Sequence, residues 1–252
     1  MISQNRNKEI KKVIIIPTYL ETESLNSLLS NLVPTCSNET AIVICDDSGP
    51  NLNKFYESLV SKIGREKELE IMVDFSEVKN GRGHAIFRGF QLSTKFFPNA
   101  DFFLECDADE SHRVEDINMI LDHNPNSEFV IGSRYLKQSK IVGWPISRRI
   151  FSKLLNLFIP RILELETSDA TNGLRRYSRR AVKAILESQI RTSGFIVLSE
   201  FAFILKKTGI YPEDVPTTFI NRKIGSSTVT YRELLNSANG LIRLIAKSNE
   251  RR

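Results

Sequence analysis

An apolar strand pattern runs into two aspartates in Phe102-Phe103-Leu104-Glu105-Cys106-Asp107-Ala108-Asp109-Glu110-Ser111-His112, and the rest of the chain can be interpreted from this point. In extended backbone the side chains of residues i and i+2 point to the same side, so Asp107 and Asp109 can direct two carboxylates at one place. Open α/β sheets bind ligands at the carboxyl ends of their strands. Carboxylate oxygens suit Mg²⁺ or Mn²⁺, which often bind together with substrate phosphates.

A lone Asp-x-Asp sequence is more often a solvated acidic turn, so the interpretation depends on the pattern around it. Short β-branched and apolar runs at 13–16, 41–45, 70–75 and 129–135 predict further strands. Helical spacing of apolar residues lies between them, at about 24–32, 52–63, 85–92 and 114–122. This alternation predicts an α/β fold, a mostly parallel sheet flanked by crossover helices.

The second half of the chain has a different pattern. An apolar and basic segment covers 146–165, and a polar loop covers 168–173. Helices are expected at 181–186 and 200–207, an outer strand at 211–219, and an amphipathic helix at 231–248. Without a repeat or a linker, one domain over 1–252 is predicted, with a flexible terminus at 1–12.

Composition describes an ordinary globular chain, with 252 residues, 41% hydrophobic and 26% charged. The net charge of +5 favours an anionic partner: a nucleic acid, a phosphorylated substrate or an anionic membrane. The sequence contains no basic patch with interleaved aromatic residues, which argues against nucleic acid as the partner. No signal sequence or run of roughly 18 apolar residues is visible. The cysteines Cys36, Cys45 and Cys106 have no metal-ligand spacing, and Cys45 and Cys106 lie in apolar runs. We therefore expect reduced thiols in a cytoplasmic protein.

Carboxylates follow three predicted strands. They are Glu21, Asp46 with Asp47, and Asp107 with Asp109. Strand ends at one edge of a parallel sheet lie close together, so these groups are expected to form one site for ribose hydroxyls, a base edge and a divalent metal. Gly81 and Gly83 precede a helix whose backbone N–H groups could approach a phosphate. A dinucleotide fingerprint would need a third glycine at Ile86, which argues against an oxidoreductase.

At this point the sequence resembles the family 2 glycosyltransferases of the GT-A fold. The motifs that carry this likeness are Pro17-Thr18-Tyr19-x-Glu21, Asp46-Asp47-Ser48-Gly49-Pro50, Gly81-x-Gly83-x-Ala85, Asp107-Ala108-Asp109-x-Ser111-His112 and Gly132-Ser133-Arg134-Tyr135. Three later motifs are similar to the dolichyl-phosphate mannose synthases within it. These are Gly143-Trp144-x-x-x-Arg148-x-x-x-Ser152, Ser168-Asp169-x-Thr171-x-x-x-Arg175-x-Tyr177 and Phe219-Ile220-x-Arg222-x-x-Gly225-x-Ser227.

The resemblance implies metal-dependent, inverting transfer of mannose from GDP-mannose to dolichyl or another polyprenyl phosphate. It assigns the donor to Pro17, Thr18, Tyr19, Glu21, Asp46, Asp47, Gly81, Gly83 and Asp107, and the Mg²⁺ or Mn²⁺ ion to Asp107 and Asp109. The catalytic set is Asp107, Asp109, Asp169 and Arg222, with Arg222 at the donor phosphates and Asp169 in a supporting or base role. Such an arginine and a metal stabilise charge on the leaving oxygen.

For the acceptor phosphate the resemblance implies Arg134, Arg148 and Ser152. Arg148 and Ser152 are four residues apart, so on a helix they share a face. The apolar and basic segments at 146–165 and 231–248 suit an anionic membrane surface. We therefore expect a peripheral membrane enzyme, with a small membrane-spanning subunit as a further partner in some relatives. Inward packing of both segments is the alternative.

Several positions depart from the family pattern. They are Leu20, Asp47-Ser48-Gly49, Leu198 and Thr228. These departures leave the sugar and nucleotide open, so UDP-glucose with the same acceptor is one alternative. A family 2 enzyme for a soluble glycan is a second, and a non-catalytic nucleotide- or lipid-binding module is a third.

Overall fold

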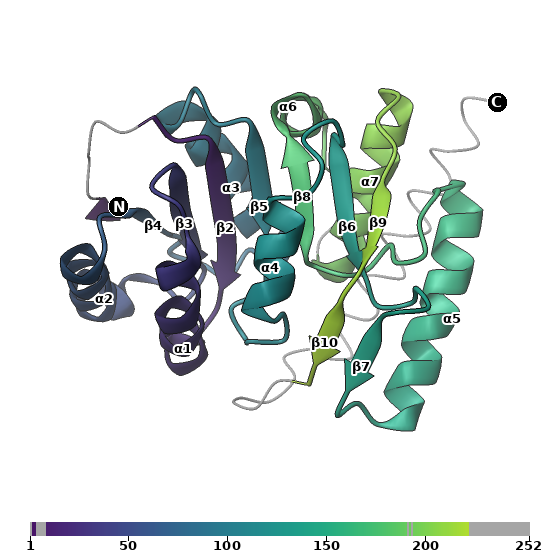
Figure 1. Ribbon diagram of the computed structural model, residues 1–252, viewed down its shortest axis with the longest axis horizontal. Helices are drawn as coiled ribbons and strands as arrows, with labels where there is room; N and C mark the ends of the chain where they lie inside the picture. The colour runs from purple at the N-terminus through teal and green to yellow at the C-terminus, as the bar shows by residue number, and fades with distance from the viewer. Residues whose placement is uncertain (1, 4–8, 191, 193, 222–252) are drawn as a thin grey trace.

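The computed structural model describes residues 2–3, 9–190, 192 and 194–221, and its centre is an eight-stranded sheet with the order β1-β4-β3-β2-β5-β8-β6-β9. Its strands are β1 (Ile2–Ser3), β2 (Lys12–Thr18), β3 (Thr40–Asp46), β4 (Glu70–Phe75), β5 (Phe102–Glu105), β6 (Phe129–Ser133), β8 (Arg175–Ser178) and β9 (Glu213–Pro216). β2 is parallel to β3 and β5, and β3 to β4. The predicted mostly parallel sheet is therefore confirmed (Figure 1).

Helices cover both faces of this sheet. They are α1 (Thr22–Leu32), α2 (Asn53–Glu66), α3 (Arg82–Phe96), α4 (Val114–Leu121), α5 (Ile146–Leu163), α6 (Arg179–Leu186) and α7 (Val197–Lys207), with short 3₁₀ turns at Val33–Thr35, Pro50–Leu52 and Gly194–Ile196. Side chains alternate along β2: Ile14 and Ile16 pack with α1, α2 and α4, whereas Val13 and Ile15 pack with α3, α6 and α7. This alternation is what a strand buried on both faces requires.

The strand order reverses at β2. The chain moves from β2 to β3 and β4 on one side, and β5 then pairs with the other side of β2. The arrowhead of β2 points to the lower edge in Figure 1, and β5, which is parallel to it, ends at the same edge. A crevice at such a reversal is where open α/β sheets bind ligands. The loops after β2 and β5 carry Glu21, Asp107 and Asp109 to this place.

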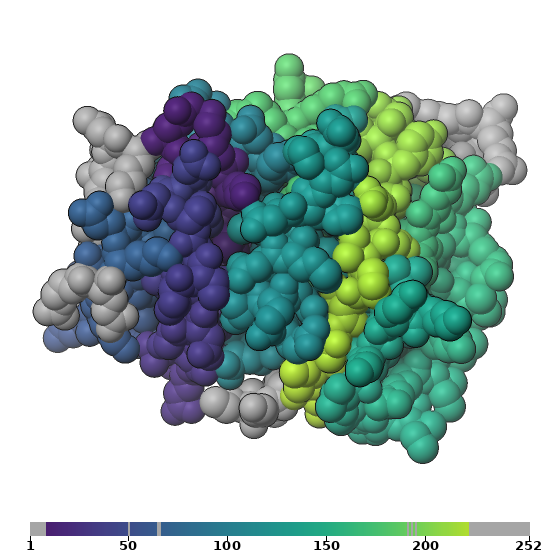
Figure 2. All heavy atoms as spheres, in the orientation of Figure 1, coloured from purple at the N-terminus to yellow at the C-terminus, as the bar shows by residue number. Residues whose placement is uncertain are grey.

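A second, two-stranded sheet lies beside the first. β7 (Lys140–Val142) and β10 (Thr218–Ile220) pair in parallel, and α5 follows β7. Figure 2 shows that β7 and α5 form one flank of the molecule, on the side away from β2 and β3. The helix ends at Glu164, which adopts a left-handed conformation with φ 52°.

Three elements differ from the sequence-based expectation. The predicted outer strand at 211–219 is two short strands, β9 and β10, in different sheets. β8 was not predicted, because Arg175 and Arg176 interrupt the apolar pattern, yet both are buried and the strand lies antiparallel between β5 and β6. β1 lies in the expected flexible terminus and pairs with β4. The amphipathic helix predicted at 231–248 lies outside the described residues.

Candidate active site

The loops after β2 and β3 are tied together. The two strands pair in register up to Thr18 and Asp46. Beyond them, the Asp47 N–H donates to the Thr18 carbonyl (3.0 Å), and the Leu20 N–H donates to Ser48 Oγ (2.6 Å). Leu20 has a positive φ of 55°, a conformation that asparagine adopts more readily. The predicted donor residues at 17–21 and 46–47 therefore belong to one rigid unit.

Asp46 and Asp47 have different environments. Asp46 is fully buried; its Oδ1 accepts from Ser48 Oγ (2.7 Å), and its Oδ2 has no hydrogen-bond partner among the described residues. Burial raises the pKa of Asp46 above its ordinary value, although Ser48 opposes this shift. The Tyr56 hydroxyl also opposes this shift, so Asp46 has protein partners at the end of β3.

Asp47 is already saturated by the protein. Its Oδ2 accepts from the backbone N–H groups of Asn80 (2.9 Å) and Gly81 (2.8 Å). Its Oδ1 accepts from Arg88 Nη1 (2.8 Å), and Arg88 Nε also donates to Asp74 (2.9 Å). Asp47 therefore fixes the loop before α3.

Gly81 precedes α3 and Gly83 is the second residue of that helix, and the two glycines have separate functions. Gly81 has φ +88°, so it allows the loop to turn into the helix. A Cβ on Gly83 would lie 2.9 Å from Val197, so this glycine allows close packing against α7. Beside the loop, Lys79 Nζ lies 4.2 Å from the centroid of the Tyr19 ring.

Asp107 is held by two basic side chains. Arg82 Nε donates to its Oδ1 (3.0 Å), and His112 Nε2 lies 3.3 Å from its Oδ2. Burial alone would raise the pKa of Asp107, but Arg82 and His112 hold it far below its ordinary value. The side chain keeps 26% of its surface exposed, so the ionised carboxylate is only partly shielded from solvent. Asp109 is buried two residues further on and accepts from the Ser111 N–H (3.1 Å).

A buried network of ion pairs and hydrogen bonds lies next to Asp107. Glu105 accepts from Tyr177 OH (2.7 Å) and from Arg82 Nη1 (3.2 Å). Arg175 lies in the same layer and donates to the carbonyls of Ala170, Asn172 and Leu198. β8, the strand that the sequence pattern did not predict, thus supplies the buried residues Arg175 and Tyr177 of this network.

The aspartates fit a divalent cation in chemistry and in position. They offer hard oxygen ligands at the end of β5, and Asp107 is ionised and partly exposed. In the described part of the chain, however, no three His, Cys, Asp or Glu side chains converge to hold a metal ion. A cation bound here would need further oxygens, which substrate phosphates characteristically provide.

A second cluster centres on a buried pair of Arg134 and Asp169. Arg134 Nε and Nη2 donate to Asp169 Oδ2 and Oδ1, both at 2.7 Å, and Nη2 also donates to Thr171 Oγ1 (2.7 Å). Burial alone would raise the pKa of Asp169, but Arg134 holds it below its ordinary value. Two of the predicted site residues therefore bind each other, and Asp169 remains an ionised acceptor.

Aromatic rings surround this pair. The Arg134 guanidinium carbon lies 5.5 Å from the ring centroids of Trp144 and Phe219. Arg148 lies 4.1 Å from the Trp144 ring, and its Nη1 donates to Asn221 Oδ1 (3.1 Å). Arg134 and Arg148 are thus brought to the same indole.

Ser152 is joined to this cluster through hydrogen bonds. Its hydroxyl accepts from Tyr135 OH (2.6 Å). One turn further along α5, Asn156 Nδ2 donates to Thr171 Oγ1 (2.9 Å), and Asn156 Oδ1 accepts from the Ala170 N–H (2.8 Å). The inner face of α5 is therefore fixed to the loop that carries Asp169.

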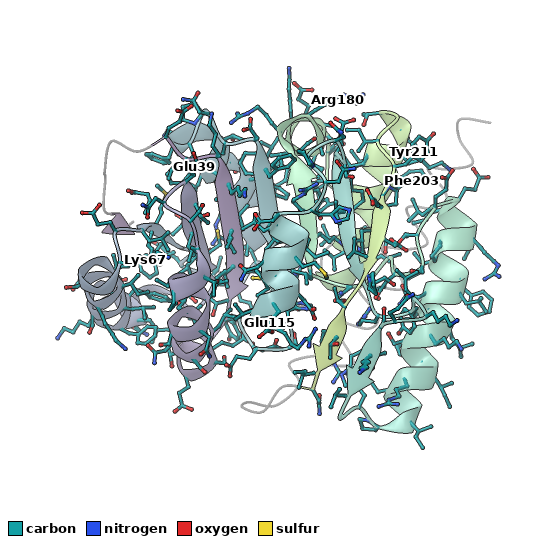
Figure 3. All side chains as sticks on the ribbon, viewed as in Figure 1. Glu39, Lys67, Glu115, Arg180, Phe203 and Tyr211 are labelled. Carbon is teal, nitrogen blue, oxygen red and sulfur yellow. The ribbon has the colours of Figure 1, made fainter. Side chains whose placement is uncertain are left out.

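The outer face of α5 is apolar and exposed, from Ile146 (77% exposed) to Phe158 (54% exposed). Its exposed large apolar side chains are Ile146, Ile150, Phe151, Leu154, Leu157, Phe158 and Ile162, and its exposed basic ones are Arg149, Lys153 and Arg161. Side chains of α5 project outward from the body in Figure 3. Across the described residues, no helix combines the length and apolarity that a membrane crossing needs.

The structure thus gathers the predicted residues into two groups, one at the ends of β2, β3 and β5 and one between β6 and α5. Sequence reasoning missed Arg82, Glu105 and Asn156 as members of these groups. Arg82 lies between the two glycines of the quoted motif, and Glu105 lies two residues before Asp107. This closeness in sequence was the only feature that could have indicated their place in the site. The predicted Arg222 lies outside the described residues.

A mostly parallel sheet with paired aspartates after its central strand defines a glycosyltransferase of the GT-A fold. The Glycosyl transferase family 2 model matches residues 13–186, well over half of the chain. The chain belongs to glycosyl transferase family 2, and it is an enzyme of that class.

Two curated relatives match across most of the chain. An undecaprenyl-phosphate mannosyltransferase of Micrococcus luteus is 28% identical over 221 residues, which cover 88% of each protein. A polyprenol monophosphomannose synthase of Mycolicibacterium smegmatis is 27% identical over 221 residues, covering 87% of this chain and 81% of that protein.

Solved structures share the fold at low sequence identity. Glucosyl-3-phosphoglycerate synthase from Mycobacterium tuberculosis, in a complex with Mn²⁺, UDP and its product, has a TM-score of 0.61 and 14% identity over 94% of this chain and 79% of that one. Mannosyl-3-phosphoglycerate synthase from Rubrobacter xylanophilus has a TM-score of 0.59 and 16% identity over 95% and 74%.

Proposed function

We propose that this enzyme transfers a sugar from a nucleotide sugar to a polyprenyl phosphate at a membrane surface, with mannose from GDP-mannose as the favoured donor. The observation that carries the proposal is the position of α5. Its inner face holds Arg148 and Ser152 beside the buried Arg134, and its outer face is apolar and exposed. The named activities of the two curated relatives support the same acceptor class and sugar.

The donor would bind at the reversal between β2 and β5. Residues 17–21 and Asp46 would hold the nucleoside, because they lie at the paired ends of β2 and β3. Asp107 and Asp109 would hold a Mg²⁺ or Mn²⁺ ion, whose charge would stabilise the departing diphosphate. Arg222 would contribute a guanidinium to the same phosphates.

The acceptor phosphate would bind near Arg134, Arg148 and Ser152. A phosphate monoester is largely dianionic near pH 7, so it needs little help from a general base. Asp169 is fully engaged with Arg134 and would act by orienting that guanidinium. An acceptor oxygen would bond to the anomeric carbon as the bond to the diphosphate oxygen breaks on the opposite face, which inverts the configuration.

We propose a peripheral location on the cytoplasmic side of the membrane. Apolar side chains flanked by arginine and lysine suit the interface of an anionic bilayer, and α5 presents such a set. A lipid acceptor embedded there would present its phosphate to the inner face of the same helix. A small membrane-spanning subunit would strengthen docking.

A panel of radiolabelled nucleotide sugars, offered with a short polyprenyl phosphate and Mn²⁺, tests the proposal. We expect label from GDP-mannose in the lipid fraction, and a comparable yield from UDP-glucose would change the sugar assignment. Label that never enters lipid with any donor would contradict the proposed acceptor.

Arg148→Ala tests the acceptor site separately. We expect the Michaelis constant for the lipid to rise, while calorimetric titration shows unchanged nucleotide binding. Equal loss of both would place Arg148 in the donor site or in the fold. Lys62→Ala is the matched control, since Lys62 is an exposed cation of α2, on the side of the molecule away from α5 (Figure 1).

A further inference from the structure

Arg82 occupies a defined place against the predicted metal ligand Asp107. It is the first residue of α3, and only 13% of its side chain is exposed. Its Nε and Nη2 lie 3.0 and 2.9 Å from Asp107 Oδ1, and its Nη1 lies 3.2 Å from Glu105 Oε2. One guanidinium therefore pairs with two carboxylates at the end of β5.

The Gly173 backbone and Glu105 hold the Arg82 guanidinium in place. Arg82 Nη2 donates to the Gly173 carbonyl (3.3 Å), and a Cβ at Gly173 would lie only 2.4 Å from the same nitrogen. Glu105 is itself fixed by Tyr177. Burial alone would lower the pKa of Arg82, but Asp107 and Glu105 hold it above its ordinary value, so the cation persists at any physiological pH.

A bound cation beside Asp107 changes what the Asp-x-Asp pair offers to a metal. Asp107 Oδ1 is already used, and a divalent ion close to it would be repelled by the guanidinium. The described residues supply no third His, Cys, Asp or Glu ligand to compensate. The second oxygen, Oδ2, faces His112 Nε2 at 3.3 Å. Without the donor, a metal ion would therefore meet an Asp107 carboxylate whose two oxygens already face basic side chains.

We propose that Arg82 makes divalent-metal binding conditional on the donor diphosphate. The diphosphate supplies both the negative charge that offsets Arg82 and the further oxygens that the ion needs. Metal and nucleotide then bind with positive coupling, so free enzyme does not hold the ion in an unproductive state. This inference rests on the metal site of the proposed function, and it makes Arg82 a positioning residue for Asp107.

Titration of the full chain with Mn²⁺ tests this directly. Binding is measured as the decrease of the electron paramagnetic resonance signal of free Mn²⁺. Titrations are run without nucleotide and with GDP or UDP, against nucleotide without protein as the blank. For wild type we expect binding about 5- to 150-fold tighter with the diphosphate, the usual range of coupling between sites. For Arg82→Gln we expect Mn²⁺ to bind without nucleotide, with a correspondingly smaller gain when it is added.

Two further variants keep the test decisive. Arg82→Gln leaves Glu105 buried without its arginine, so Arg82→Gln/Glu105→Gln removes both charges. It should still raise Mn²⁺ affinity without nucleotide, but by less than Arg82→Gln, because the negative charge of Glu105 is lost as well. Arg180→Gln removes an exposed cation of α6 that pairs with Glu128, at the opposite edge of the sheet (Figure 3). It should leave Mn²⁺ affinity without nucleotide unchanged, which separates a local effect from net charge.

The outcomes distinguish this inference from the function it rests on. Wild-type binding of Mn²⁺ that is equally tight with and without nucleotide would overturn the conditional site, while the metal assignment stands. Unchanged or weaker binding in folded Arg82 variants would overturn it too, because structural damage alone does not raise affinity. Failure of wild type to bind Mn²⁺ even with GDP and UDP would refute the metal itself.

Discussion

Asp107 and Asp109 differ in how they are held, although the sequence presents them as a pair. Asp107 faces Arg82 and His112 and is partly exposed, whereas Asp109 is buried against the Ser111 N–H. Both lie at the end of β5, where the sheet reverses its strand order. The i, i+2 spacing predicted that both aspartates lie at the end of one strand. Their different partners determine how each carboxylate is charged and exposed.

Replacing either aspartate by asparagine should reduce sugar transfer by at least ~10²-fold, because charge stabilisation at the leaving group is lost. Initial rates with saturating donor and acceptor measure this loss. Asp101→Asn, at an exposed carboxylate before β5, is the matched control and should keep full activity. Full activity of Asp109→Asn in chelator-treated buffer would contradict the metal assignment.

The Arg134–Asp169 pair should give the stability of the protein an acid-side pH dependence. The folded pKa of Asp169 lies below its ordinary value of 3.8, so its contribution is present above that pH and is lost as the pH falls through the lowered pKa. In Asp169→Asn, breaking the buried pair should cost about 3–5 kcal/mol near neutral pH.

Urea unfolding from neutral pH down to about pH 3 measures both effects. The variant should lose less stability than wild type on acidification, because the group that titrates is absent. An identical acid-side slope in the two proteins would show that Asp169 does not carry it.

At the scale of elements, α3 lies against β2 because residue 89 is glycine. A Cβ at this position would lie 2.4 Å from Ile15 Cγ2 and 3.2 Å from Cys45 Sγ. Gly89→Ala should therefore lower the free energy of unfolding by about 1–3 kcal/mol, as expected for an overpacked core. Gln91→Ala, on the exposed side of α3, should change it by less than about 0.5 kcal/mol. Equal effects would contradict this packing.

The outer face of α5 should bind lipid. Leu154→Ser/Phe158→Ser removes two exposed apolar side chains and should reduce sedimentation with anionic liposomes, while unfolding stability stays within about 0.5 kcal/mol. Phe96→Ser/Met119→Ser removes exposed apolar side chains from α3 and α4 and should leave sedimentation unchanged. Similar losses in both double variants, or none in the first, would contradict docking through α5.

Elements with regular patterns could be predicted, and those set by distant contacts could not. The β-branched runs of β2 and β3 and the leucines of α1 match the structure because local periodicity determines them. β8 escaped because its arginines are buried through bonds to carbonyls far along the chain, such as Arg176 to Asn124 and Ser127. Arg82 escaped for the same reason: Glu105 and Gly173, which hold it, come from other elements.

For the whole molecule, two groups of residues lie on one edge of the sheet. Donor residues gather around β2, β3 and β5, and acceptor candidates lie between β6, β7 and α5. The pKa of Arg134 lies above its ordinary value. Burial alone would lower this pKa, but Asp169, Tyr135 and, to a smaller extent, Asp107 raise it. The two groups are therefore within electrostatic reach. In Figure 3 the labelled Glu115, next to the start of α4, lies toward this edge, and Arg180 lies at the opposite one.

The central claim is transfer to a lipid phosphate, and a competition between acceptors tests it most directly. The enzyme receives radiolabelled GDP-mannose with equal concentrations of a polyprenyl phosphate and 3-phosphoglycerate, and label is then partitioned between organic and aqueous phases. We predict that label enters the organic phase, and that Arg148→Ala lowers this yield. Label that accumulates in phosphoglycerate while the organic phase stays empty would contradict the account.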